Sequence, residues 1–146
     1  MQLVAYQPDI PQNLGSLIRL SACMGVPLHI IEPCGFLLDD KRMRRAAMDY
    51  YDAAHITRHS SWERFLANLP EQARLVLLST KASTTYTAFA YRPDDMLMLG
   101  RESSGVPVAV AAHAHVLIPM QPGTRSLNVA LAASMVLGEA LRQIRG

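Results

Sequence analysis

Short apolar runs alternate along the chain with longer segments in which apolar residues recur at helical spacing. A continuous apolar run of strand length, bounded by turn residues, is typical of a strand buried on both faces. The runs that predict strands are residues 2–6, 28–31, 75–79, 96–99 and 115–119. Strands that alternate with helices predict an α/β fold in which helices cover both faces of a mostly parallel sheet. No linker or repeat divides residues 1–146, so we expect one domain.

Capping residues set the expected limits of the helices. Asn13 is a suitable N-cap for a helix over residues 14–25, which Gly25 and Pro27 would end. We expect the later helices to begin at Asp39 or Asp40, at Ser60 or Ser61, and at Ser126. One further short helix is expected between the last two strands.

Polar and glycine-containing segments follow three of the predicted strands, at residues 7–15, 99–107 and 119–128. In parallel sheets, ligands bind beyond the carboxyl ends of the strands. The sequence therefore predicts a ligand site that these three loops form together.

The glycines of the second loop allow two interpretations. Gly100 and Gly105 bracket four residues, as in a phosphate-binding loop, but Val106 and Pro107 stand where Gly-Lys-Ser/Thr would continue. The simpler interpretation is a strand-to-helix turn, although glycines also let a backbone approach a flat ring closely. Ser126 and Asn128 of the third loop are suitable helix caps, but the free backbone N–H groups of a helix N-terminus also suit an anion or carboxylate, and both alternatives stay open.

Charge indicates nucleic-acid binding only weakly. The formal net charge is only +2, so a basic surface has to come from local clustering. On a helical wheel, Met43, Ala47 and Tyr50 share one face of the segment 39–51. The opposite face carries Lys41, Arg44 and Arg45, which are a solvated helix face or a patch that contacts phosphates.

Several classes of protein are not expected. The start MQLVAYQPD has no basic region typical of a signal peptide, and the apolar stretch 129–137 is short of the ~20 residues that span a membrane. Cys23 and Cys34 suggest no disulfide framework, so a cytoplasmic protein is expected. The histidine pairs at 55 and 59 and at 113 and 115 lack a third ligand, so we expect no metal site.

Three stretches together resemble the three motifs of the SPOUT superfamily of RNA methyltransferases: IPQNLGSLIRLSACMG (10–25), LGRESSGVP (99–107) and IPMQPGTRSLNVALAAS (118–134). Residues 28–50 further resemble the small branch that methylates the wobble nucleotide of certain leucine transfer RNAs. The resemblance implies a parallel sheet with a deep trefoil knot near the C-terminal end. It also implies S-adenosylmethionine as cofactor and a transfer RNA as partner. Since this chain shows no separate RNA-binding domain, we expect a compact substrate such as an anticodon stem-loop.

The resemblance also implies roles for particular residues. Its catalytic motif positions fall on Asn13, Arg19, Ser126 and Asn128. Its cofactor pocket falls on Leu78, Ser79, Thr80, Leu99, Gly100, Glu102, Ile118, Met120, Ser126 and Leu127. RNA contacts are expected from Arg19, Lys41, Arg44 and Arg45.

Arg19 is expected to face the ligand loops and to act on the ribose. A guanidinium stays protonated and has no acceptor, so we favour stabilisation of the developing alkoxide and a grip on the adjacent phosphate. The alternative, in which an unusual environment lets Arg19 take a proton, stays open. Ser126 and Asn128 would orient the cofactor or hold their loop, and Glu102 would support the second loop.

The final helix predicts a homodimer. Its apolar residues point in widely different directions, more than the stripe that one sheet face can cover. These residues are Leu127, Val129, Leu131, Met135, Val136 and Leu137. The resemblance agrees, because family members dimerise through this region and build the RNA site from two subunits.

Two other functions remain as alternatives. Within the family, the target is another transfer RNA position or a ribosomal RNA. From a different class, the chain is a flavodoxin-like nucleotide-binding module without catalysis.

Overall fold

The computed structural model describes residues 1–107, 110 and 112–146, and its centre is a six-stranded sheet in which all paired strands are parallel. The strand order is β3-β2-β1-β5-β4-β6. The strands are β1 (Gln2–Tyr6), β2 (Leu28–Ile31), β3 (Ile56–His59), β4 (Arg74–Leu78), β5 (Asp95–Leu99) and β6 (Ala114–Val116). The predicted parallel sheet is thus confirmed, and the order of strands reverses at the β1–β5 pair.

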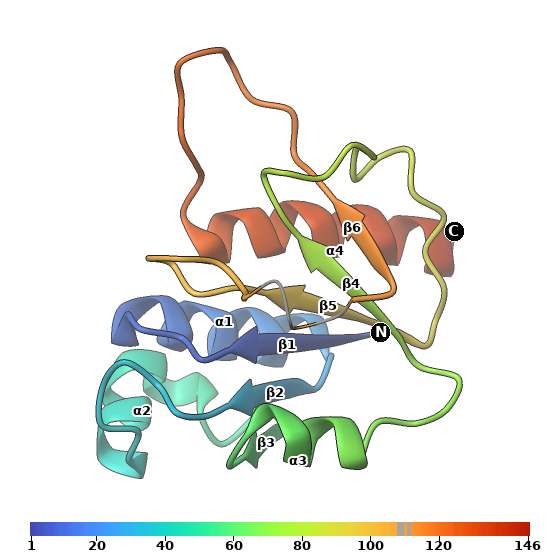
Figure 1. The fold of residues 1–146 in the computed structure, drawn as a ribbon. Coiled ribbons are helices and arrows are strands. Elements are labelled where there is room, and N and C mark those ends of the chain that lie inside the picture. Colours follow the sequence, from blue (N-terminus) through green and yellow to red (C-terminus); the bar gives the residue numbers. More distant parts are fainter. Residues whose placement is uncertain (108–109, 111) are drawn as a thin grey trace.

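Helices cover both faces of the sheet, as predicted (Figure 1). The helices are α1 (Pro11–Met24), α2 (Asp40–Ala47), the 3-10 turn η1 (Met48–Tyr50), α3 (Trp62–Ala67) and α4 (Val129–Arg145). Alternate residues of β1 show the two layers. Leu3 and Ala5 pack with α1, α2 and α4, whereas Val4 and Tyr6 pack with Phe65 of α3. Among the described residues, no helix has both the length and the apolar content needed to cross a bilayer.

Two predicted caps are confirmed. The side chain of Asp39 accepts a hydrogen bond from the N–H of Arg42 at 2.7 Å, and α2 follows it. Ser61 accepts from the N–H of Arg64 at 3.1 Å and begins α3.

Two other predicted helix starts are wrong. The first helix begins earlier, with Ile10 at the N-cap position and Pro11 in the first turn, so Asn13 lies inside the helix. The last helix begins later, because Asn128 is its N-cap and Ser126 precedes it. Asn13 is thus not used as the cap of α1, and Ser126 is not used as the cap of α4, so both side chains are available for other contacts.

Two further differences concern whole elements. The edge strand β3 was not predicted, because its exposed Thr57 and Arg58 interrupt the apolar pattern. A short helix was predicted between β5 and β6, where the described residues form turns and no helix; residues 108, 109 and 111 of this connection lie outside the described residues.

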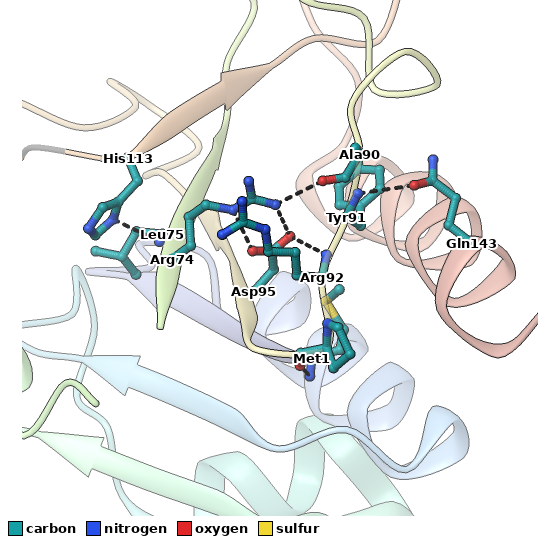
Figure 2. Close-up of polar contacts among 10 residues, drawn as sticks. Met1, Arg74, Leu75, Ala90, Tyr91, Arg92, Asp95, His113 and Gln143 are labelled. Carbon is teal, nitrogen blue, oxygen red and sulfur yellow. Dashed lines mark hydrogen bonds and ion pairs between the residues drawn. The ribbon is translucent and has the colours of Figure 1, made fainter. Parts of the chain in front are cut away.

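A buried ion pair joins two strands where they begin (Figure 2). We call this end of the sheet, formed by the amino-terminal ends of the strands, the amino-terminal edge, and the opposite end the carboxyl-terminal edge. Arg74, the first residue of β4, contacts both carboxylate oxygens of Asp95, the first residue of β5, at 2.7 and 2.8 Å. Asp95 is 0% exposed and also accepts from the N–H of Arg92 at 2.8 Å. Arg74 donates in addition to Ala90 O at 2.9 Å, and Gln143 of α4 accepts from the N–H of Tyr91 at 3.0 Å. These contacts of Arg74, Asp95 and Gln143 therefore join β4, β5, their connection and α4.

Candidate functional site

Three loops at the carboxyl-terminal edge of the sheet are joined by a row of side-chain hydrogen bonds. Asn13, in the first turn of α1, donates from Nδ2 to Oε1 of Glu102 across 3.3 Å. Its Oδ1 accepts from Nδ2 of Asn128 at 2.9 Å, just before α4. Asn128 also caps α4, because its Oδ1 accepts from the N–H of Ala130 at 2.9 Å. The three segments that were predicted to form one site therefore meet.

Asp9 and Glu102 hold the first two loops together at both backbone and side chain. The N–H of Asp9 donates to Glu102 Oε2 at 3.0 Å, and the N–H of Glu102 donates to Asp9 Oδ1 at 3.2 Å. Ser103 Oγ also donates to Asp9. We call Asp9, Asn13, Glu102 and Asn128 the loop network.

The two carboxyl groups of the loop network differ in acidity. Hydrogen bonding with the Glu102 side chain lowers the pKa of Asp9, whereas burial, and then the contact with Asp9, raises the pKa of Glu102. As pH rises, Asp9 therefore loses its proton before Glu102 does. Glu102 is suited to holding its loop in place.

The turn after β5 is closed by its own backbone. Arg101 and Gly105 exchange two hydrogen bonds, with N···O distances of 3.0 and 2.8 Å. A Cβ atom on Gly100 would lie 2.7 Å from the carbonyl carbon of Gly105, and Gly105 itself has a φ of +66°. Both glycines are thus required for this close approach of two backbone segments.

The ends of three strands meet beside this turn. Leu78 pairs with Leu99 of β5 and with Val116 of β6. The N–H of Ser79 continues the ladder by donating to Val116 O at 2.9 Å. Leu78, Ile118 and Met120 are half-buried. Apolar side chains mixed with backbone donors and acceptors suit a ligand with a flat ring and polar edges.

Other predicted cofactor residues lie further out. Thr80, Ser126 and Leu127 are exposed, and none of them forms a side-chain hydrogen bond to the loop network among the described residues. Figure 1 shows that the segment 117–128 extends away from the sheet before it returns to α4. A ligand held by these residues would have to lie between that segment and the strand ends.

Arg19 does not contact the loop network of its own chain. It is exposed on α1, and its Cζ lies 4.6 Å from the ring centroid of Tyr50 in η1. Six residues separate it from Asn13, which at about 100° per residue places the two side chains on different faces of α1. The expectation that Arg19 faces the ligand loops is therefore not met within one chain.

The basic residues of α2 are exposed, as the wheel predicts. Arg44 is paired with Asp52 at 2.8 Å and lies over the ring of Tyr51, so its charge is partly neutralised. Lys41 and Arg45 form no ion pair within the described parts of the chain. Because η1 follows α2 directly, these residues and Arg19 lie on neighbouring elements.

Sequence reasoning did not single out Gln7 or Asp9. Gln7 follows β1 with a φ of +43°, which is rare for a residue other than glycine and costs about 1–3 kcal/mol. Its Oε1 is buried and has no hydrogen-bond partner among the residues that the structure describes. The Gln-Pro dipeptide after an apolar run was the available signal, since it marks a turn.

A second set of buried polar groups was also missed. His29 Nδ1 lies 2.9 Å from His59 Nε2, and His29 Nε2 contacts Gln2 Oε1. No group of three His, Cys, Asp or Glu side chains arranged to hold a metal ion occurs among the described residues.

Comparison with known proteins gives one family and several close relatives. Residues 1–138 match the SpoU rRNA Methylase family. A protein of Beijerinckia indica named tRNA (cytidine(34)-2'-O)-methyltransferase is 59% identical over 145 residues, which cover 97% of this chain and 91% of that protein. The protein of the same name from Escherichia coli K12 is 44% identical over 149 residues, which cover 99% of this chain and 94% of that protein.

Solved structures agree in fold. A structure described as "Structural insights into the 2-OH methylation of C/U34 on tRNA" superposes with a TM-score of 0.92 at 40% identity, covering 97% of this chain and 94% of that one. The methyltransferase AviRb from Streptomyces viridochromogenes, in complex with the cofactor AdoMet, gives a TM-score of 0.82 at 26% identity, covering 98% of this chain and 60% of that one.

Proposed function

The chain belongs to the SpoU rRNA methylase family, and on that basis we propose that it methylates the ribose 2′-hydroxyl of nucleotide 34 in transfer RNA. The observation that carries this proposal is nearly full-length identity, up to 59%, to proteins named for that reaction. The loop network supports it, because it brings together the three segments that carry the family motifs. Leucine transfer RNAs and their anticodon stem-loop are the proposed substrate on the resemblance of residues 28–50, and the cytoplasm is the proposed location.

S-adenosylmethionine is the proposed methyl donor, since a relative of this fold is known in complex with it. It supplies a methyl group that its sulfonium charge already activates. The residues proposed to hold it are Leu78, Ser79, Thr80, Leu99, Gly100, Glu102, Ile118, Met120, Ser126 and Leu127. The strand ends fit such a group, because Leu78, Ile118 and Met120 offer half-buried apolar side chains and Gly100 lets the turn beside them stay narrow.

The remaining task for the protein is to position a weakly acidic hydroxyl and to stabilise its developing charge. We propose Arg19 for that role, because a guanidinium donates to both an alkoxide and a phosphate. Asn13, Glu102 and Asn128 keep the loops in place by their mutual hydrogen bonds. Ser126 lies two residues before Asn128 and is proposed to orient the cofactor.

A homodimer would explain the position of Arg19, which contacts Tyr50 and not the loop network of its own chain. Four large apolar side chains are exposed in α4 or just before α1 and α4. They are Leu131 at 60%, Met135 at 41%, and Ile10 and Leu127 at 40%. Val136 is 0% exposed and belongs to the core, so only one side of α4 is available to a partner. We propose that the loops of a second chain, docked through this surface, complete the site beside Arg19.

The oligomeric state has a direct test. Met135→Glu should convert the dimer into a monomer in sedimentation at micromolar concentration, because a charge would replace apolar contact. Leu66→Glu is the matched control, since Leu66 is 42% exposed on α3, on the other face of the sheet. A wild-type protein that is fully active as a monomer would refute the dimer.

We also propose the trefoil knot and a single domain over residues 1–146. The knot is supported by contacts of the connection between β4 and β5 with two later segments. Tyr86 N–H donates to Leu117 O at 2.8 Å, and Gln143 of α4 donates to Phe89 O at 3.0 Å. Contacts of this connection with both C-terminal segments are expected if the C-terminal region is knotted around it.

The reaction is tested with purified protein, unmodified transfer RNA and S-adenosylmethionine. Nuclease digestion and mass spectrometry should find a 2′-O-methyl group on nucleotide 34. Arg19→Ala should lower kcat by at least about 100-fold while the affinity for S-adenosylhomocysteine stays within about threefold. Arg64→Ala, an exposed arginine on α3, is the control. A methyl group on another nucleotide would reject the assignment of position 34, and unchanged turnover in Arg19→Ala would reject the role of Arg19.

A further inference from the structure

A pocket on the α3 face of the sheet lies outside the residues assigned above. It opens at the carboxyl ends of β1 and β2 and has a volume of about 370 Å³, within the usual range of small-molecule sites. Its wall includes Tyr6, Gln7, Glu32, Ser61, Trp62 and Glu63. We call it the aromatic pocket.

Two aromatic rings give the aromatic pocket a stiff apolar wall. Tyr6 and Trp62 are in edge-to-face contact, with ring centroids 5.9 Å apart and an interplanar angle of 75°. Trp62 also contacts Phe65, whose ring centroid is 5.5 Å away and which is 1% exposed. Trp62 is therefore held against the core while part of its ring remains accessible, as a stacking platform for a flat ligand requires.

Two hydrogen-bond acceptors in the wall of the aromatic pocket, Gln7 Oε1 and the Glu63 carboxylate, have no protein donor among the described residues. Gln7 Oε1 is buried and has no partner in the described part of the chain, although Gln7 adopts a rare backbone conformation. Glu63 is exposed and forms no ion pair within residues 1–107, 110 and 112–146. Glu32, in contrast, is paired with Arg58 at 2.9 Å. A ligand that satisfies this site has to bring N–H donors on a planar ring.

We propose that the aromatic pocket binds a nucleobase that carries an exocyclic amino group, cytosine or adenine, from an unpaired nucleotide of the RNA substrate. The inference rests on the proposed function, which supplies the RNA. Stacking on Trp62 and donation to Gln7 Oε1 and Glu63 would satisfy both features of the wall, whereas the carboxylate of Glu63, which no described cation pairs, disfavours a phosphate. The Cζ of Arg101, next to Glu102, lies 5.8 Å from the Tyr6 ring, so the pocket adjoins the loop network.

The protein contains one tryptophan, so its indole N–H gives a single NMR signal from within the aromatic pocket. The ¹⁵N-labelled protein is titrated with cytidine and, separately, with uridine, which places a carbonyl oxygen where cytidine has its amino group. Cytidine should shift the Trp62 signal saturably and bind about tenfold more tightly than uridine. Equal affinities, or no shift with cytidine, would overturn the inference.

Glu63→Gln tests the carboxylate, because an amide can also donate to the uridine carbonyl. The preference for cytidine should fall to less than about threefold, whereas Glu71→Gln, an exposed residue outside the pocket, should keep it. In the methylation assay, Glu63→Gln should raise KM for the RNA and leave kcat unchanged. If no RNA is methylated but cytidine still shifts the signal, the proposed function fails and the pocket stands. If nucleotide 34 is methylated but cytidine gives no shift, only this inference fails.

Discussion

The two edges of the sheet both carry polar clusters that join distant segments, but the clusters differ in burial. At the amino-terminal edge, Asp95 is fully buried and its carboxylate accepts from Arg74 and Arg92. At the carboxyl-terminal edge, Asn128 is exposed, and Gln7 Oε1 in the wall of the aromatic pocket has no partner in the described residues. One edge is closed, and the other presents groups that a ligand can use.

This difference separates stability from function. A buried charge with all its hydrogen bonds made is costly to disturb, because removal of one partner leaves the other desolvated and alone. Strained or unsatisfied groups persist where a ligand completes them. We therefore expect substitutions at the two edges to have separable effects on unfolding and on binding.

The largest loss of stability is expected at the amino-terminal edge. Asp95→Asn removes the charge that pairs with Arg74 and should lower the free energy of unfolding by about 3 kcal/mol. Denaturant unfolding measures this loss, and calorimetry with S-adenosylhomocysteine should show unchanged affinity in the folded protein. Asp94→Asn, at the neighbouring position, provides the control. A loss below 1 kcal/mol would remove the distinction between the edges.

A smaller effect is expected from acid, through the pair of histidines between β2 and β3. Burial, and then His59, lowers the pKa of His29 from 6.5 to about 4. A pKa lowered by folding means that the unfolded chain binds the proton more readily, so stability is complete above pH 6.5 and falls between pH 6.5 and 4. The full shift corresponds to about 3 kcal/mol, and because solvent screens the half-buried imidazole we expect a decrease of about 2 kcal/mol.

Unfolding curves at several pH values measure this dependence. His29→Gln should flatten it, and the exposed His55→Gln should not. An equally steep decrease in His29→Gln would assign the acid sensitivity to other groups.

A still smaller effect on stability is expected at Gly100, with a larger effect on binding. The Cβ of Gly100→Ala would lie 2.7 Å from backbone atoms of Gly105, so the turn has to shift. We expect about 1 kcal/mol of destabilisation and at least tenfold weaker binding of S-adenosylhomocysteine. Gly138→Ala, where a Cβ meets nothing within 4 Å, is the control. Unchanged affinity in Gly100→Ala would exclude this turn from the cofactor site.

The elements that the sequence predicted well are those with a regular local pattern. Strands β1, β2, β4 and β5 are buried on both faces, so each is a continuous apolar run. The edge strand β3 is exposed on one side and has no such run. Asn13 was read as a cap because Asn favours that position, but the proline at residue 11 sets an earlier start.

The site was predicted as a set of loops but not as a set of contacts. The family resemblance named Asn13, Glu102 and Asn128, yet their hydrogen bonds join residues separated by 89 and 115 positions. No local periodicity encodes such pairs. The same holds for the contact of His29 with His59, and for the aromatic pocket, whose walls come from residues 6–7, 32–33, 61–63, 107 and 110.

Asn13→Ala tests the comparison of the two edges most directly, because Asn13 links all three loops and lies far from the buried ion pair. Calorimetry with S-adenosylhomocysteine and denaturant unfolding are measured on the same preparation, with Asn68→Ala as control, since Asn68 also donates one side-chain hydrogen bond, to Arg64 O at 2.9 Å. We predict at least tenfold weaker binding and a loss of unfolding free energy below about 1 kcal/mol. Unchanged binding together with a loss as large as that of Asp95→Asn would contradict the account.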